Sequence, residues 1–170
     1  QREDPPGALR RALTEAIDQI RLIDTHEHIV AEQIRLQEPL DFTYLMPHYL
    51  SSDLVSAGMP LDDLEAIRQL GRAMRDALRS GIYPRGEPGY PFPERLPDKE
   101  PLLMEKWRKF APFWAKVRNT GYAQCIMTAI SELFGIGDLN ERTVETLSRA
   151  LQDSNKKGWY QYVLKERARI

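Results

Sequence analysis

The chain has 170 residues, 42% of them hydrophobic, which suits one compact domain and argues against two independent ones. Its 24 basic and 25 acidic residues leave a formal net charge of −1, which excludes a general electrostatic attraction to nucleic acid or anionic membranes. No apolar run reaches the roughly 20 residues of a spanning helix, and the single cysteine excludes an internal disulfide. We therefore expect a cytoplasmic protein without nucleic-acid or membrane partners.

The first half of the chain predicts helices around one short strand. After a Pro-Pro pair, apolar residues at spacings of three and four predict an amphipathic helix over 5–20. The stretch 22–30 (LIDTHEHIV) alternates and holds β-branched residues, which predicts a strand. Residues 41–46 (DFTYLM) indicate a second, weaker extended piece. Two further helices are predicted, over 51–58 and from 60 to 81.

The second half is predicted to be helical after an irregular connection. Residues 81–101 hold three glycines and six prolines, which excludes a helix or a central strand. This connection is either a surface loop or an ordered loop beside a pocket. Helices are predicted over 102–118, with a kink at Pro112, over 122–134, from 138 to 151, and from 155 onward. The chain as supplied is thus predicted to be mainly α.

Two of the three histidines, His26 and His28, lie two residues apart in the predicted strand. Residues i and i+2 of a strand point to the same face, so both imidazoles would face one metal ion. Neutral imidazole binds zinc and related divalent ions, and Asp24 on that face either accepts a hydrogen bond from a ligand or joins the site. Spacing alone leaves chance as an alternative.

Other catalytic motifs are excluded by the residues present. The position four after His26 is Val30, so the His-Glu-x-x-His motif of helix-borne zinc proteases is absent. No Gly-x-Ser-x-Gly turn and no glycine-rich phosphate loop occur either.

The motif Asp-Thr-His-Glu-His at 24–28 resembles the end of the first barrel strand in the amidohydrolase superfamily, which comprises metal-dependent hydrolases on a (β/α)₈ barrel. The "amidohydrolase 2" and uronate isomerase branch is the most similar. There, a helical insertion after that strand resembles residues 48–58 (HYLSSDLVSAG). Segments 118–122 (RNTGY) and 158–160 (GWY) also resemble this branch.

The resemblance implies that His26 and His28 bind a catalytic divalent metal, with zinc the first candidate. The metal would activate water or polarise a substrate carbonyl or hydroxyl. His48 and Tyr49 are then candidate substrate contacts, and Arg118 a candidate partner for a substrate carboxylate. Each has a structural alternative: a capping or packing histidine, a half-buried packing tyrosine, and an arginine at a helix end.

The chain departs from this family in length and in ligands. Such a barrel takes about 250 residues and eight strands, and no histidine follows His48. The chain, which begins without methionine, is thus expected to be the N-terminal part of a longer enzyme. Residues 1–30 would supply the first helix and the metal-binding strand, and residues 31–170 a helical insertion subdomain. The other catalytic residues would lie outside this chain.

Two functions follow from the sequence. The first is part of a metal-dependent hydrolase or isomerase that acts on a small polar, carboxylated molecule and is inactive as this fragment alone. The second is a non-catalytic helical interaction module with structural histidines. In either case the uncovered apolar surface of such a chain favours homo-oligomers.

Overall fold

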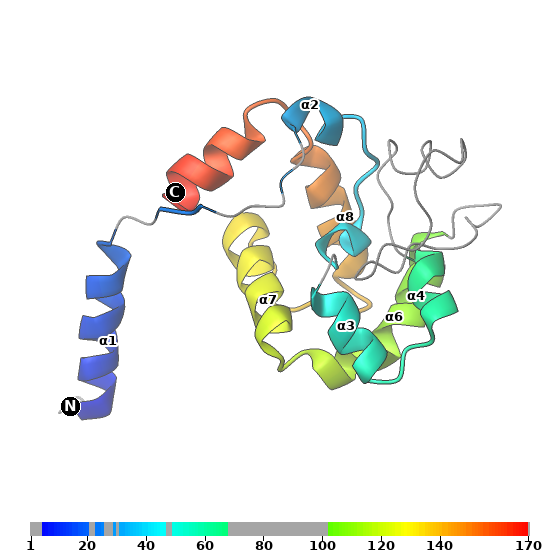
Figure 1. Cartoon of the computed structure of the whole chain (residues 1–170), viewed down its shortest axis with the longest axis horizontal. Coiled ribbons are helices and arrows are strands. Elements are labelled where there is room, and N and C mark those ends of the chain that lie inside the picture. Colours follow the sequence, from blue (N-terminus) through cyan, green and yellow to red (C-terminus); the bar gives the residue numbers. More distant parts are fainter. Residues whose placement is uncertain are drawn as a thin grey trace. The chain divides into compact units, whose positions relative to one another are not determined.

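The computed structural model describes residues 5–20, 23–25, 29, 31–46, 49–67 and 102–169. Within these ranges every regular element is a helix, and no strand or sheet occurs (Figure 1). The described part of the chain therefore has an all-α fold. The chain divides into two compact units, one made of Gln1–Glu32 and Lys157–Ile170 and the other of Gln33–Lys156. The C-terminal residues thus group with the N-terminal ones, whereas the sequence interpretation had placed them in the subdomain 31–170.

The predicted strand over 22–30, and with it the first strand of a barrel, is wrong for the residues that the structure describes. Ile23, Asp24, Thr25 and Ile29 belong to no regular element. A strand satisfies its backbone N–H and C=O groups only by pairing with another strand. The described ranges contain no such partner, so local alternation did not produce a strand.

The extended piece predicted over 41–46 is a 3₁₀ helix, η1, at Phe42–Leu45. Asp41 is its N-cap, and its carboxylate accepts hydrogen bonds from the backbone N–H and the hydroxyl of Thr43. An aspartate that caps the backbone two residues on favours a turn over a strand. The polar residue at the start of the stretch outweighed its β propensity.

The first unit contains helix α1 at Pro5–Asp18, which confirms the predicted amphipathic helix. Its apolar stripe, however, is uncovered: Leu9, Leu13 and Ile17 have 61%, 54% and 63% of their surface exposed. The first unit also holds Glu32, the first residue of the short helix α2 (Glu32–Arg35), and the C-terminal π-helix η2 at Gln161–Arg167.

The second unit is a cluster of helices. Its longer elements are α3 (Tyr49–Ser56), α4 (Leu61–Ile67), α6 (Leu103–Val117), α7 (Gly121–Phe134) and α8 (Val144–Asp153). Helices α3, α4 and α6 pack against one another, α7 packs against α3 and α8, and α8 packs against η1 (Figure 1). These elements confirm the predicted helices over 51–58, 102–118 and 122–134 and the start of the one from 60. The predictions for 68–101 lie outside the described residues.

Helix α6 continues through Pro112, where the sequence predicted a kink. Proline removes the hydrogen bond to the carbonyl of residue i−4, here Arg108. Both Pro112 and Arg108 are exposed, so water can satisfy that carbonyl. The helix ends at Val117, and Thr120 caps the next helix by accepting from the N–H of Ala123.

An aromatic cluster forms the centre of the second unit. Phe110 is fully buried, and its ring lies 5.4 Å from that of Phe42 and 5.5 Å from that of Trp114, measured between centroids. Trp107 completes the cluster through an edge contact with Phe42 and a tilted contact with Phe110. Because these rings stand three to four residues apart on α6, one face of that helix supplies most of the cluster.

A buried ion pair fixes α6 to the residue that caps η1. The Nζ of Lys106 lies 2.7 Å from Oδ2 of Asp41, with 4% of the lysine side chain and 15% of the aspartate side chain exposed. A second pair, between Lys109 and Asp63, joins α6 to α4 with both side chains about one third exposed or more. The two pairs offer a matched comparison of buried and exposed charges.

We expect Asp41→Asn to lower the free energy of unfolding by about 3 kcal/mol, because it removes the carboxylate beside a buried ammonium group. The asparagine oxygen still accepts from Thr43, so the cap is kept. Asp63→Asn, the matched control, should cost less than about 1 kcal/mol. Urea denaturation of both variants measures the difference, and equal losses would contradict this account of Lys106.

Candidate functional site

The three histidines, His26, His28 and His48, lie outside the described residues. Their described neighbours Asp24 and Thr25 are exposed and lie in no helix, as does Ile29 on the other side of the motif. Helix α1 ends before the motif at Asp18, and α2 begins after it at Glu32. The motif therefore belongs to a connection between two helices, residues 19–31.

The carboxylate of Glu32, the residue that follows this connection, accepts hydrogen bonds from the backbone near the C-terminus. Its Oε1 accepts hydrogen bonds from the backbone N–H groups of Gly158, at 3.0 Å, and Tyr160, at 3.1 Å. Gly158 has a φ of +87°, in the left-handed region that glycine adopts without a Cβ penalty. The sequence interpretation singled out residues 158–160 but missed Glu32, its partner 126 positions away from Gly158.

At the other end of the connection, Asp18 contacts Arg169, the last described residue of the chain. Nη1 of Arg169 donates a hydrogen bond to the carbonyl oxygen of Asp18 at 3.0 Å. Asp18 is the last residue of α1, where carbonyl groups have no partner within the helix. Both contacts lie within the first compact unit.

Tyr49, a predicted substrate contact, is the first residue of α3 and stacks on Tyr122 of α7. The ring centroids are 4.6 Å apart and the planes differ by 8°. The two residues are 58% and 46% exposed. A nearby hydrogen bond of 2.6 Å from the hydroxyl of Thr120 to Asp53 also joins the start of α7 to α3. The pair presents aromatic surface on which a sugar ring or a planar molecule can stack.

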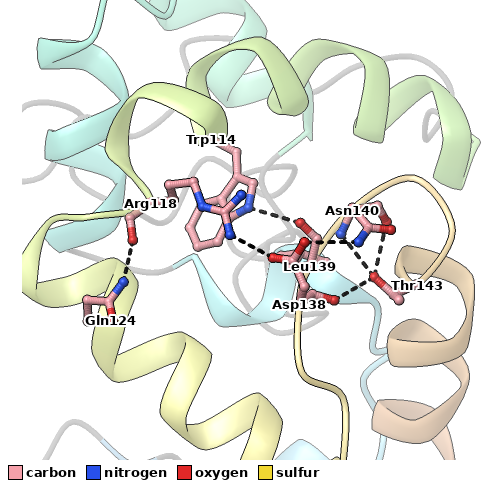
Figure 2. A network of polar contacts seen from close by, with 7 residues as sticks. All are labelled: Trp114, Arg118, Gln124, Asp138, Leu139, Asn140 and Thr143. Carbon is pink, nitrogen blue, oxygen red and sulfur yellow. Dashed lines mark hydrogen bonds and ion pairs between the residues drawn. The ribbon is translucent and has the colours of Figure 1, made fainter.

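Arg118, the predicted carboxylate partner, follows the last turn of α6. Its Nη2 donates to Oδ1 of Asp138 at 2.9 Å, with 48% and 40% of the two side chains exposed (Figure 2). Its backbone carbonyl accepts from Nε2 of Gln124. Arg118 thus already pairs with a carboxylate, but one that is exposed enough for a substrate carboxylate to compete with it.

The loop that carries Asp138 is fixed by other contacts (Figure 2). Nε1 of the buried Trp114 donates to the carbonyl of Leu139 at 3.1 Å. The hydroxyl of Thr143 donates to the carbonyl of Asp138 at 2.7 Å and accepts from the N–H of Asn140 at 2.9 Å. The loop therefore keeps its conformation without depending on Arg118.

Within the described ranges, no three histidine, cysteine, aspartate or glutamate residues are grouped so that they could hold a metal. No described helix is long and apolar enough to cross a membrane. No known protein family, curated protein or solved structure matches this chain. The amidohydrolase resemblance, the metal site and the cytoplasmic location therefore stay predictions.

Replacement of Arg118 should cost little stability. We expect Arg118→Ala to lower the free energy of unfolding by less than about 1 kcal/mol, because the ion pair is exposed. Thr143→Val, of similar shape, should cost about 1 to 2 kcal/mol, because it removes the hydrogen bonds of the hydroxyl with Asp138 and Asn140. Thermal unfolding of the two variants gives the comparison. A larger loss for Arg118→Ala would mean that Arg118 is structural and not available to a substrate.

Proposed function

We propose that His26 and His28 supply two ligands to a divalent metal, zinc first, in a metal-dependent hydrolase or isomerase of the amidohydrolase type. The observation that carries the proposal is the motif Asp-Thr-His-Glu-His in a connection whose described residues are exposed and non-helical. The expectation that both imidazoles bind one ion rests on their spacing of two residues and on the resemblance.

The donor set of the motif fits zinc. Zinc binds imidazole nitrogens and carboxylate oxygens at short distances. The motif offers two imidazoles, and the exposed Asp24, two residues before His26, offers a carboxylate. When bound, the metal supplies Lewis acidity, which activates water or polarises a substrate oxygen. A catalytic zinc site uses three protein ligands and a water, so the two imidazoles need at least one more ligand. The resemblance places the remaining catalytic residues outside this chain. The described part of the chain contains no barrel strand.

Two described side chains of the second unit, considered apart from the metal motif of the first, are suited to bind a small, polar, carboxylated molecule. Arg118 offers a guanidinium group whose present carboxylate partner is exposed. Tyr49 offers an aromatic face stacked on Tyr122. Both hydrolysis and sugar-acid isomerisation are compatible with these groups, and in either reaction the chain alone, with an incomplete ligand set, should have negligible turnover.

Zinc titration of the 170-residue chain by isothermal calorimetry tests the metal site. We expect one zinc ion per chain, and loss of binding in His26→Ala and in His28→Ala, because each variant removes one of the two imidazoles. His48→Ala should retain binding, since the resemblance assigns His48 to substrate contact. Unchanged zinc binding in both motif variants would refute the proposal.

A second candidate function is a non-catalytic helical interaction module, and helix α1 supports it. Leu9, Leu13, Ile17 and Ile20 follow one another at spacings of four, four and three, and each is more than half exposed. A continuous exposed apolar stripe of this kind favours association with another protein surface. The same stripe agrees with the homo-oligomers expected from the sequence.

Sedimentation velocity of the chain tests this stripe. We expect the wild-type chain to self-associate and Leu13→Glu to reduce that association by at least about tenfold, because it places a charge in the centre of the apolar stripe. Gln19→Glu adds the same charge beside the stripe and should leave association unchanged. A monomeric wild-type chain, or equal effects of both substitutions, would exclude self-association through α1.

A further inference from the structure

We propose that helix α1 binds the α1 helix of a second copy of this chain, and that the two helices run in opposite directions. The inference rests on the second candidate function, association through the exposed stripe of α1, and it adds the identity and the direction of the partner. The large side chains of that stripe, Leu9, Leu13, Ile17 and Ile20, are 61%, 54%, 63% and 61% exposed.

The stripe has the spacing of a seam between two helices. Leu9, Leu13, Ala16 and Ile20 follow one another at spacings of four, three and four, as the core positions of a coiled coil do, and Ile17 flanks them. If two such seams align in opposite directions, Leu9 of one copy lies level with Ile20 of the other, and Leu13 with Ala16. The stripe is thus complementary to itself about a two-fold axis, so a second copy is a sufficient occupant.

The charges of α1 are divided between its two halves. Within residues 5–20 the basic side chains, Arg10 and Arg11, belong to the first half, and the acidic ones, Glu15 and Asp18, belong to the second. A parallel pair would bring like charges level with each other, whereas an antiparallel pair brings each basic half level with an acidic half. Over distances within a Debye length of about 8 to 10 Å, the first arrangement is repulsive and the second attractive. Charge complementarity therefore favours a second copy that runs in the opposite direction.

The helix dipole favours the same direction. The last turn of α1 contains Glu15 and Asp18 and no basic residue, although the C-terminal end of a helix favours cations. An antiparallel neighbour places its Arg10 beside this end. The second copy thereby supplies the cation that the last turn of α1 lacks.

The interface is short, so charges can decide its direction. A helix of 14 residues is about 21 Å long, and two such helices bury less than the roughly 1,600 Å² of a standard interface. We expect a weak dimer for that reason. Both directions bury the same apolar side chains, so the apolar contacts differ little between them, and the charges distinguish the two.

Disulfide exchange between two variants tests the direction. In chains that carry Cys125→Ser, which removes the exposed cysteine, one variant has Ala12→Cys and the other Gln19→Cys. These positions are one heptad apart on the same edge of the stripe, so they face each other across an antiparallel seam. After an equimolar mixture has equilibrated in glutathione buffer, intact mass spectrometry should find at least about tenfold more mixed disulfide than either symmetric one. Mainly symmetric disulfides, or the mixed half of a random distribution, would overturn the antiparallel pairing.

Sedimentation equilibrium of the 170-residue chain tests the charges. We expect Arg10→Glu to weaken the dimer by about fivefold, because it places a carboxylate level with the acidic half of the second copy. In a parallel pair the same substitution would relieve repulsion and strengthen the dimer. Arg149→Glu makes the same charge change at an exposed position of α8, in the other unit, and should leave the affinity unchanged.

The outcomes separate this inference from the association on which it rests. A monomeric wild-type chain, or association that Leu13→Glu leaves unchanged, overturns both. Association that Leu13→Glu abolishes, but that Arg10→Glu leaves unchanged or strengthens, overturns the antiparallel pairing alone. Circular dichroism checks the helix content of each variant, and if Arg10→Glu loses helix, the disulfide mixture decides.

Discussion

The second unit depends on the burial of Phe110, which has no exposed surface and lies among Phe42, Trp107 and Trp114. The same helix face carries Lys106, whose ammonium group is buried and must therefore keep its partner Asp41. Apolar packing and one obligatory ion pair thus act on the same two elements, α6 and η1. The packing supplies most of the driving force, and the ion pair restricts how α6 can rotate against η1.

Much of this unit could be predicted from the sequence because its signals are local. The spacing of aromatic residues in 103–117 and the threonine before Gly121 predict α6 and the start of α7 without knowledge of the rest of the chain. The predictions of extended structure over 22–30 and over 41–46 were wrong for different reasons. The first stretch alternates but finds no pairing strand among the described residues, and the second has a capping aspartate that folds it into a turn.

The candidate site residues also have features that could be predicted locally and partners that could not. The His-x-His spacing is a sequence feature, and the exposure of Arg118 agrees with its place after the end of a helix. The partners of these residues are not local. Asp138 lies 20 positions from Arg118, and Gly158 lies 126 positions from Glu32. No periodicity reports such pairs, so only the folded chain reveals that Arg118 already has a carboxylate and that Glu32 holds a helix start.

The two units differ in how much of their apolar surface is buried. The described residues of the second unit bury an aromatic cluster, and ion pairs join Lys106 to Asp41, Lys109 to Asp63 and Arg118 to Asp138. The first unit leaves the apolar stripe of α1 exposed. Its described residues also include polar contacts of Glu32 and Arg169 with backbone groups near helix ends, and an aromatic contact between Trp159 and Tyr162. An exposed apolar stripe of this kind is typical of helices that associate with another apolar surface.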